Sequence, residues 1–394
     1  LALIDVDYEP LGAASDLATA AQSNAATAHI GRESNIAASY TVTYGEIDAA
    51  FATAPHIFRE SIWQHRGGGM AMDPRGTIAE YDADTDALTV WATTQAPHMT
   101  QRMMADVMGR SPESIRIITP DVGGGFGPKV IFYPEDGVIP AAAMITGRPI
   151  KHIEDRREHF MCATQERDQL WEMEIALDND GKVLGVRGTM LHDSGAYVPW
   201  GIIMPYIASV TVPGPYVLPA YKLDVQVIYT NKVATTPVRG AGRPQAVFVM
   251  ERLLDRAARE LAIDRAEIRR RNFIQPEQMP YSVGLLFRDG RPLIYDSGDY
   301  PKGQAAAVTA SDYNTFKERQ TTALQEGRYI GIGIANYVEG TGLGPFEGVT
   351  VRIQQNGKVR VASGATTQGQ GTRTTLAQII ADNLDCPIED IEIV

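Results

Sequence analysis

The sequence predicts a mixed α+β protein that contains two copies of one hairpin–helix–strand unit. Three observations predict this class: alternating hairpin patterns, a long amphipathic helix and an internal repeat. The length of 394 residues suggests two or three domains. The composition, with 44% hydrophobic and 21% charged residues, is that of a globular protein, which excludes a disordered or fibrous class.

Three segments predict β-hairpins. Residues 78–92, 173–191 and 349–363 each contain two alternating strands around a polar turn. The second and third turns carry Asp180-Gly181 and Asn356-Gly357, dipeptides that tolerate the positive φ angles of tight turns. We therefore expect antiparallel pairing within each segment.

The clearest helix is predicted for residues 244–261. Pro244 suits the first turn of a helix. Apolar residues recur there at helical spacing: Val247, Met250, Leu253, Leu254, Ala257 and Leu261. A second helix is predicted to start at Asp264, with Glu267 completing a capping box. The apolar stripe of the first helix indicates a place in the core rather than a chemical role.

The internal repeat covers residues 78–118 and 349–394. Each copy reads as a hairpin, the triplet Thr-Thr-Gln, a helix, a short turn containing proline and a strand. The triplets begin at Thr93 and Thr366, and their matching place in the two copies favours a true duplication. In the first copy the last strand leads directly into the loop DVGGGFGPK, residues 121–129.

Charge and cysteine content exclude several classes of protein. The net charge is −12, and the longest basic run, Arg269–Arg271, lies at a predicted helix end, so we expect no nucleic-acid partner. No apolar run approaches the roughly 18 residues of a membrane span, so we expect none. Cys162 and Cys386 cannot build a disulfide framework or a zinc knuckle, which favours a reduced cytoplasmic setting.

The two ends of the sequence resemble strands in progress. The opening reads LALIDVDYEPLG (1–12) and the last residues read IEDIEIV (388–394). We therefore expect both ends to be cuts through a longer polypeptide. Residues 11–40 are rich in alanine and serine and indicate a connecting segment.

The loop DVGGGFGPK raises the possibility of a nucleotide site. A phosphate loop needs glycine before its lysine and serine or threonine after it. Here Pro128 precedes Lys129 and Val130 follows it, so that interpretation fails. A glycine-rich turn without a ligand stays open, although three adjacent glycines are costly in backbone entropy.

A dinucleotide-binding fold fits the surrounding sequence only in part. The loop lies between a predicted strand at 115–118 and a predicted helix at 135–147, and the next strand ends in acidic residues. However, the glycines are one residue short of the required spacing, and Pro140 interrupts the helix. We expect Glu154–Arg156, at the end of that next strand, to form an ion-pair cluster.

Two further loops could bind a ligand. Residues 366–371, TTQGQG, precede a predicted helix, whose first N–H groups suit an anion. Residues 237–245, PVRGAGRPQ, place Arg239 and Arg243 around glycines before the long helix, and arginine is suited to phosphate. Each loop is weak evidence alone. The sequence has no Gly-x-Ser-x-Gly elbow, no His-Glu-x-x-His and no Cys-x-x-Cys, and its seven histidines are scattered.

The order of these loops is more specific than any one of them. TTQ-x-PH, GGGFG-x-K, RGAGRPQ before a long helix and QGQG before another follow one another along the chain. In this order they resemble the molybdenum-binding large subunit of the xanthine dehydrogenase, aldehyde oxidase and aerobic carbon monoxide dehydrogenase family. Two flanking stretches resemble that family as well: VDYEPLG (6–12) its α/β hammerhead domain, and RRRNFIQPEQMPY (269–281) the link between its cofactor domains.

The resemblance implies a division into three parts. Residues 1–43 would be the end of the hammerhead domain and a linker. Residues 44–275 would form the first molybdopterin-binding domain, and residues 276–394 the start of a truncated second one. The molybdopterin-binding domains would contain the duplicated units.

The resemblance also implies a cofactor, a molybdopterin dinucleotide that carries molybdenum and is typically the cytosine form in bacteria. Gln95 would hydrogen-bond the oxo ligand of the metal. Residues that match the family's motifs would contact the cofactor: Gly124, Gly125, Phe126, Gly127, Arg239, Gln368, Gly369, Gln370 and Gly371. None of them is expected to coordinate the metal directly.

The implied reaction is hydroxylation of a carbon atom with water as the oxygen source. Electrons would pass to [2Fe-2S] clusters and FAD on a small iron–sulfur subunit and a medium FAD subunit, because two cysteines cannot hold such clusters. We expect a dimer of heterotrimers. The family's glutamate base lies in a Gly-x-Gly-Glu motif that this sequence lacks, so no catalytic residue is identified. A non-catalytic, partner-binding role and a Rossmann-type NAD or FAD oxidoreductase stay open as alternatives.

Four positions bear on the substrate. Val130 and Ala241 stand where purine oxidisers of the family carry glutamate and an aromatic residue, which argues against xanthine. Gly240 stands where the copper-dependent carbon monoxide enzymes carry cysteine, which argues against carbon monoxide. An aldehyde or an N-heteroaromatic compound remains. Tyr197 either shapes the substrate pocket or belongs to the core.

Overall fold

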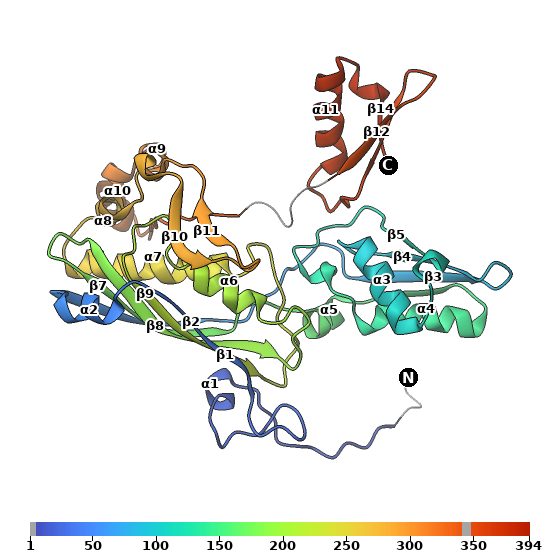
Figure 1. Cartoon of the computed structure of the whole chain (residues 1–394), viewed down its shortest axis with the longest axis horizontal. Coiled ribbons are helices and arrows are strands. Elements are labelled where there is room, and N and C mark those ends of the chain that lie inside the picture. The colour runs from blue at the N-terminus through green and yellow to red at the C-terminus, as the bar shows by residue number, and fades with distance from the viewer. Residues whose placement is uncertain (1–4, 341–347) are drawn as a thin grey trace. The chain divides into compact units, whose positions relative to one another are not determined.

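The chain forms two compact units, each made from two separate stretches of sequence (Figure 1). The structure is a computed structural model and describes residues 5–340 and 348–394. Unit 1 contains Leu1–Gly67 and Glu166–Glu339, and unit 2 contains Gly68–Gln165 and Gly340–Val394. Both units combine sheets with helices, which confirms the predicted mixed α+β class.

Unit 1 is built on a mixed five-stranded sheet with the order β1-β9-β8-β7-β2. Its strands are β1 (Ile36–Tyr44), β2 (His56–Gln64), β7 (Gln169–Leu177), β8 (Val183–Gly195) and β9 (Tyr221–Tyr229). β7 and β8 form the antiparallel hairpin predicted around Asp180-Gly181. β8 and β9 are parallel, and helix α6 (Ile203–Thr211) lies in their connection. Residues 36–40, expected to be a connection, instead belong to β1 because they pair with β9.

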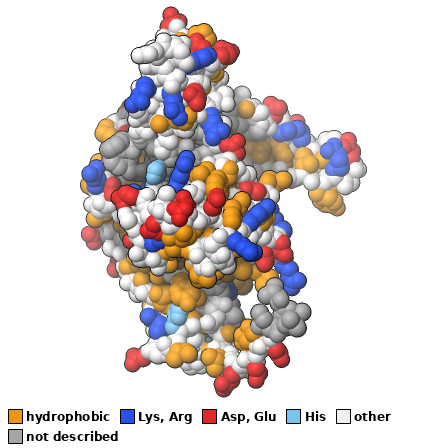
Figure 2. Space-filling model, turned by 90° about the vertical axis from the view of Figure 1, so that its right-hand side faces the viewer, with side chains coloured by type: hydrophobic (Ala, Val, Ile, Leu, Met, Phe, Trp, Pro, Cys, Tyr) orange, Lys and Arg blue, Asp and Glu red, His pale blue; other side chains and the backbone are white. Residues whose placement is uncertain are grey.

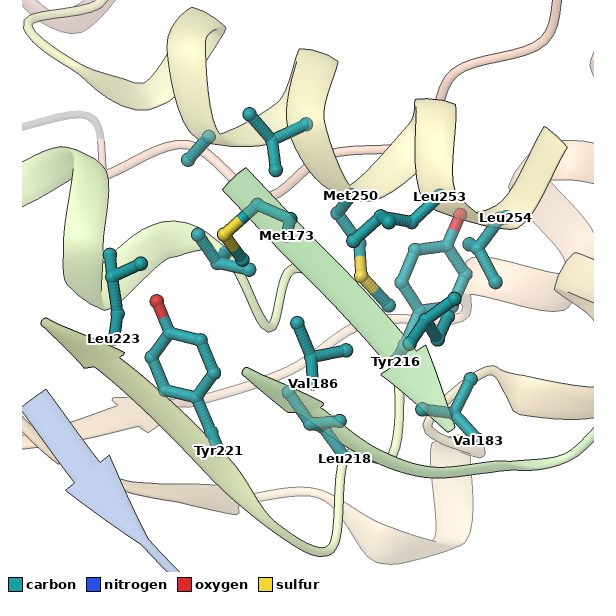
Figure 3. Packing of buried hydrophobic residues seen from close by; sticks show 14 of the residues in the cluster. Met173, Val183, Val186, Tyr216, Leu218, Tyr221, Leu223, Met250, Leu253 and Leu254 are labelled. Atoms are coloured by element: carbon teal, nitrogen blue, oxygen red, sulfur yellow. The ribbon is translucent and has the colours of Figure 1, made fainter. Parts of the chain in front are cut away.

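The main core of unit 1 lies between this sheet and helix α7 (Arg243–Glu260), the predicted amphipathic helix. Met250 and Leu253 of α7 point toward strand residues such as Met173 (Figure 3). Burying each such side chain stabilises the fold by about 1.5–3 kcal/mol. The packing of α7 thereby fixes the loop of residues 237–242 that precedes it.

Shorter elements complete unit 1. Helix α2 (Ile47–Thr53) packs against a second cluster that contains Ala176, and α1 (Leu17–Ala20) packs against Ile228. The other elements are α8 (Arg265–Asn272), β10 (Tyr281–Leu286), β11 (Pro292–Tyr295), α9 (Tyr300–Ala310) and α10 (Phe316–Gln325). Residues 5–15 form no helix or strand, so the strand expected there is not observed, and residues 1–4 lie outside the described residues.

The basic run Arg269–Arg271 is part of an ion-pair network. The guanidinium of Arg269 is fully buried and lies 2.7 Å from Glu251 and 2.9 Å from Asp255. The predicted capping box at the start of α8 is only half formed. Asp264 accepts a hydrogen bond from the N–H of Glu267, but the Glu267 carboxylate pairs with the other two arginines of the run.

Unit 2 contains two sheets, and the first has the strand order β5-β4-β3-β6. Its strands are β3 (Gly76–Asp82), β4 (Ala87–Ala92), β5 (Ile115–Ile118) and β6 (Ile150–Ile153). Helices α3 (Pro97–Met108) and α4 (Pro134–Thr146) pack with this sheet around a small core that includes Leu88 and Met104. Helix α5 (Arg156–Cys162) follows β6.

The second sheet of unit 2 repeats the plan of the first. It contains β12 (Val349–Ile353), β13 (Val359–Ser363) and β14 (Ile391–Ile393), with helix α11 (Thr372–Leu384) between the last two. In both copies an antiparallel hairpin is followed by a helix, a short 3₁₀ turn and a strand parallel to the second hairpin strand. Ala105 and Ala381, which align in the repeat, are both buried. The shared connectivity confirms the predicted duplication.

The topology of the first sheet contradicts the dinucleotide-binding alternative. In that fold the strands before and after the first helix are neighbours in the sheet. Here β5 and β6 flank α4 in sequence, but β4 and β3 separate them in the sheet. Helix α4 itself continues through Pro140. The strand order, and not a broken helix, therefore excludes this fold.

On the face drawn in Figure 2, Lys and Arg side chains are interspersed with Asp and Glu, so its described residues form no continuous positive stripe. Among the described residues, no helix is long and apolar enough to cross a membrane.

Candidate functional site

The side chain of Gln95 is fixed by the glycine loop of unit 2. Its Oε1 accepts a hydrogen bond from the backbone N–H of Gly127 at 2.9 Å. The backbone N–H of Gln95 donates to the carbonyl of Lys129 at 2.9 Å. Because Oε1 is occupied as an acceptor, Nε2 points elsewhere, and no described residue accepts a hydrogen bond from it. The amide therefore offers two donor hydrogens to a ligand.

The glycines of the loop allow this close approach. A Cβ added at Gly125 would lie 2.3 Å from Cδ of Gln95, so a larger residue would displace the amide. Within the described part of the chain, the N–H groups of Gly124, Gly125 and Phe126 have no acceptor. Gly124 and Gly125 are buried, and buried N–H groups without a partner are uncommon in folded proteins. These three donors fit a ligand that lies against the loop.

Phe126 occupies a strained position at the centre of the loop. Its φ angle is +56°, which is uncommon for a residue with a side chain, and the residue is 41% exposed. The ring lies beside Gly124, where an added Cβ would come within 2.7 Å of it. Backbone strain of this kind is found where a loop must present groups to a ligand.

Lys129 is a buried cation beneath the loop, and sequence reasoning assigned it no role. Its ammonium donates to Asp73 Oδ1 at 2.8 Å and to the Asp73 carbonyl at 3.0 Å. Burial lowers the pKa of Lys129, and the pairing with Asp73 opposes that shift. This lysine is therefore committed to a structural partner and is not presented to a phosphate. Val130, the next residue, is half-buried in the 3₁₀ turn Pro128–Val130.

The loop of the second repeat lies against the first repeat. The hydroxyl of Thr366 donates to the Gln95 carbonyl at 3.2 Å, and the carbonyl of Thr367 accepts from the N–H of Val122 at 3.1 Å. The Gln368 amide donates to the Thr366 hydroxyl at 2.8 Å. The two Thr-Thr-Gln triplets are thus in direct contact.

The remaining part of that loop is open to solvent. Gln370 Oε1 accepts from the N–H of Gln368, which stabilises the turn before α11. A Cβ added at Gly369 or Gly371 would meet no described atom within 4 Å. Gly371 is the N-cap of α11, so the positive end of that helix dipole also faces this open space.

A cluster of ion pairs is connected to the glycine loop through Tyr133. The Tyr133 hydroxyl donates to the Pro128 carbonyl at 2.9 Å, and the Arg75 guanidinium lies 3.6 Å from the centre of the Tyr133 ring. Arg75 pairs with the buried Glu154, which also binds His159. Burial opposes the ionisation of Glu154, but its bonds to Arg75 and His159 hold its pKa below the usual range. Glu154 is therefore part of an ion-pair cluster. The cluster predicted from Glu154–Arg156 forms only in part, because Asp155 caps α5 and Arg156 donates to the Met72 carbonyl.

The other predicted site residues lie in unit 1. Arg239 is exposed and has no ion-pair partner among the described residues, whereas Arg243 pairs with Glu339 at 3.0 Å. Ala241 has a φ angle of +50° in the turn before α7. Tyr197 is 70% exposed and contacts the ring of His29 edge-on, so it is not a core residue.

The structure thus brings together, within unit 2, the predicted residues of three segments. They are Gln95, Gly124, Gly125, Phe126, Gly127, Val130, Gln368, Gly369, Gln370 and Gly371. Sequence reasoning missed Lys129, Asp73 and the Arg75–Glu154 pair. The adjacency of Lys129 to the glycines was the one available signal.

Comparisons with known proteins identify the family. A family model described as "Molybdopterin cofactor-binding domain" matches residues 28–273, and a second model with the same description matches residues 306–394. The chain is 34% identical over its whole length to the 6-hydroxypseudooxynicotine dehydrogenase complex subunit gamma of Paenarthrobacter nicotinovorans, of which it covers 49%. The chain belongs to the xanthine dehydrogenase family of molybdopterin-dependent oxidoreductases.

Other members of this family are similar in sequence and structure. The chain is 34% identical to the carbon monoxide dehydrogenase large chain of Hydrogenophaga pseudoflava, and the match covers 88% of this chain and 45% of that one. The crystal structure of quinoline 2-oxidoreductase from Pseudomonas putida 86 matches with a TM-score of 0.92 and 33% identity, over 100% of this chain and 51% of that one. The chain spans about half the length of the curated relatives it matches.

The residues present fit a molybdopterin cofactor. The buried backbone donors of Gly124 and Gly125 and the Nε2 of Gln95 all lack an acceptor within the described part of the chain, and a pterin–metal group is rich in acceptors. The open N-terminus of α11 at Gly371 suits an anionic group of such a cofactor.

Proposed function

We propose that this chain is part of the catalytic large subunit of a molybdenum hydroxylase. The whole protein would hydroxylate an aldehyde or N-heteroaromatic carbon with water as the oxygen source. The cofactor, when bound, supplies the redox chemistry, and the chain supplies position and electrostatics. The residues that would hold it are those gathered in unit 2. Arg239, which lies in unit 1, stays a prediction from the family's motif.

The observation that carries this proposal is the orientation of Gln95. Its Oε1 is held by Gly127, so its Nε2 can donate only to something outside the described residues. A second amide on the repeated triplet, Gln368, is linked to it through Thr366. The Gln95 amide and three backbone N–H groups of the adjoining loop, at Gly124, Gly125 and Phe126, thus lack acceptors among the described residues, which supports an acceptor-rich ligand there.

Among possible substrates, an N-heteroaromatic compound is favoured. Two relatives at 32–33% identity are named nicotine 6-hydroxylase large subunit and quinoline 2-oxidoreductase, and both names refer to nitrogen-containing rings. Gly240 and Ala241 in the Arg239 loop support the exclusion of carbon monoxide and xanthine.

The partners would be an iron–sulfur small subunit with [2Fe-2S] clusters and a medium subunit with FAD, in a dimer of heterotrimers. Relatives are named as a large subunit, a large chain and a complex subunit, which supports a multi-subunit assembly. We also propose the cytosine form of the dinucleotide, which rests on the family resemblance alone. Cys162 and Cys386 are both free thiols, which supports a cytoplasmic location.

The reaction can be tested with labelled water. The native complex is incubated with quinoline or nicotine, an artificial electron acceptor and oxygen-18 water, and the product is analysed by mass spectrometry. We expect label in a ring hydroxyl or its keto tautomer. Turnover of aldehydes alone would redirect the substrate assignment, and a product oxygen derived from O₂ would contradict the proposed reaction.

A further inference from the structure

We propose that Lys129 is a positioning residue for Gln95, acting through its buried ion pair with Asp73. The pair fixes the turn of residues 127–130, and this turn holds both ends of Gln95. The inference rests on the proposed function, because Gln95 is expected to face the cofactor. It concerns a residue pair to which neither the motifs nor the comparisons give a role.

The first step is that the ammonium of Lys129 has a single fixed location. The Lys129 side chain is 1% exposed, and its Nζ lies 2.8 Å from Asp73 Oδ1 and 3.0 Å from the Asp73 carbonyl. An ammonium buried without its partner is strongly disfavoured. The backbone of Lys129 is therefore held at the distance that its side chain allows from Asp73.

The second step is that this backbone carries Gln95. The carbonyl of Lys129 accepts from the N–H of Gln95 at 2.9 Å and from the Thr94 hydroxyl at 3.2 Å. The N–H of Gly127, in the same turn, donates to Gln95 Oε1 at 2.9 Å. The N–H of Val130 closes the turn by donating to the Gly127 carbonyl at 2.9 Å. Movement of this turn must move both ends of Gln95.

The third step is that Asp73 also borders the other end of the loop. The N–H of Met72 donates to the Gly123 carbonyl at 3.0 Å. An added Cβ at Gly123 would lie 2.6 Å from Asp73 Oδ1. Both ends of the loop 123–129 are thus attached to residues 72–73, and the Lys129 ion pair is the attachment nearest to Gln95.

The test compares Lys129→Met, which keeps most of the side-chain length and removes the charge, with the native complex. Lys151→Met is the matched control, because Lys151 is exposed on β6 of the same unit and has no ion pair among the described residues. Three quantities are measured: molybdenum and pterin content, kcat and KM, and the EPR signal of Mo(V) after partial reduction.

We expect K129M to keep its molybdenum and pterin, to lose about tenfold or more in kcat with little change in KM, and to show an altered Mo(V) signal. Asp73→Asn keeps an oxygen acceptor for the ammonium, so we expect a smaller loss than for Asp73→Ala. K129M combined with D73A should be no worse than K129M alone.

Each alternative outcome has a distinct meaning. An unchanged kcat and Mo(V) signal in K129M would overturn the positioning role. Loss of the cofactor from K129M, together with a native kcat and Mo(V) signal in D73A, would overturn it as well. Absence of molybdenum and pterin from the native complex would instead overturn the proposed function. If K129M does not accumulate as folded protein, the same measurements are made on D73N and D73A, because Asp73 is half-exposed.

Discussion

At the residue scale, Gln95 is the side chain on which the proposed cofactor contact depends. Its amide oxygen is bound by Gly127, its main chain is bound by Lys129, and its carbonyl accepts from Thr366. Both acceptor oxygens of this residue therefore have a partner inside the protein, whereas the two Nε2 hydrogens have none among the described residues. A substitution can separate these functions, because glutamate keeps the oxygen and removes the donor.

We predict that Gln95→Glu lowers kcat about 10- to 100-fold while the free energy of unfolding changes little, since one donor to the cofactor is lost. Gln95→Ala should give a similar loss. Steady-state kinetics and urea unfolding check both. Gln325→Glu, on the exposed end of α10, is the control and should match the native protein. Native turnover in both Gln95 variants would contradict the assigned contact.

His192 is a residue whose importance is structural. It is buried in unit 1, and its Nδ1 accepts from the Gln169 amide at 3.0 Å. Its Nε2 lies 3.2 Å from the Thr235 hydroxyl, which itself donates to the Asp193 carbonyl. These contacts fit a neutral imidazole with its proton on Nε2. Burial lowers the pKa of His192 from 6.5 to about 4.

This shift predicts a loss of stability on mild acidification. Below pH 6.5 the unfolded chain binds a proton at His192, whereas the folded chain stays neutral there until about pH 4. The free energy of unfolding should therefore fall by about 3 kcal/mol over this interval from this group, at about 1.4 kcal/mol for each pH unit. Urea unfolding at pH 7 and pH 4.5 measures the change. His192→Asn should flatten the pH dependence.

At the scale of elements, the site is built from the ends of two copies of one unit. In each copy a Thr-Thr-Gln triplet follows a hairpin, and a helix follows the triplet. The first copy contributes the glycine loop after β5, and the second contributes the turn before α11. Contact between the triplets brings donors from segments about 270 residues apart into one place, as the Thr366–Gln95 bond shows.

The glycine loop yields a steric prediction. In Gly125→Ala the new methyl group would lie 2.3 Å from Cδ of Gln95, so the amide must move and kcat should fall about as far as in Gln95→Ala. When Gly125→Ala is added to Gln95→Ala, kcat should fall little further, because the side chain that the new methyl group would displace is gone. A double-mutant cycle on kcat measures this coupling.

Gly137→Ala provides the steric control. In helix α4 its added Cβ would have nearest neighbours at 3.8 Å, an ordinary contact. Alanine there should leave kcat unchanged and stabilise the helix by about 0.5–1 kcal/mol. Additive losses for Gly125→Ala and Gln95→Ala would show that the two residues do not act through each other.

The elements were largely predictable because local patterns determine them. The Asp180-Gly181 turn, the stripe of α7 and the repeated triplets indicated hairpins, helix and duplication correctly. The supporting pairs were not predictable. Lys129 and Asp73 are 56 residues apart, and Arg75 and Glu154 are 79 apart, so only the packing of the sheet reveals them. The start of β1 was missed because alanine and serine carry little strand signal.

At the scale of the whole molecule, two kinds of evidence agree on the family. The motif order along the sequence resembles the molybdenum-binding subunits, and matches to the cofactor-domain family cover residues 28–273 and 306–394. The solved structure of quinoline 2-oxidoreductase contains the same fold, and the match covers the full length of this chain. Fold alone does not define function. The donors of unit 2 that lack acceptors among the described residues connect this fold to a cofactor.

The central claim is that these donors hold a molybdenum–pterin cofactor, and its most direct test is the content of the native complex. Molybdenum is measured by elemental analysis, and the pterin is measured by extraction and fluorescence of its oxidised form. We predict both in equimolar amounts with this chain. A folded native complex that contains neither molybdenum nor pterin would contradict the account.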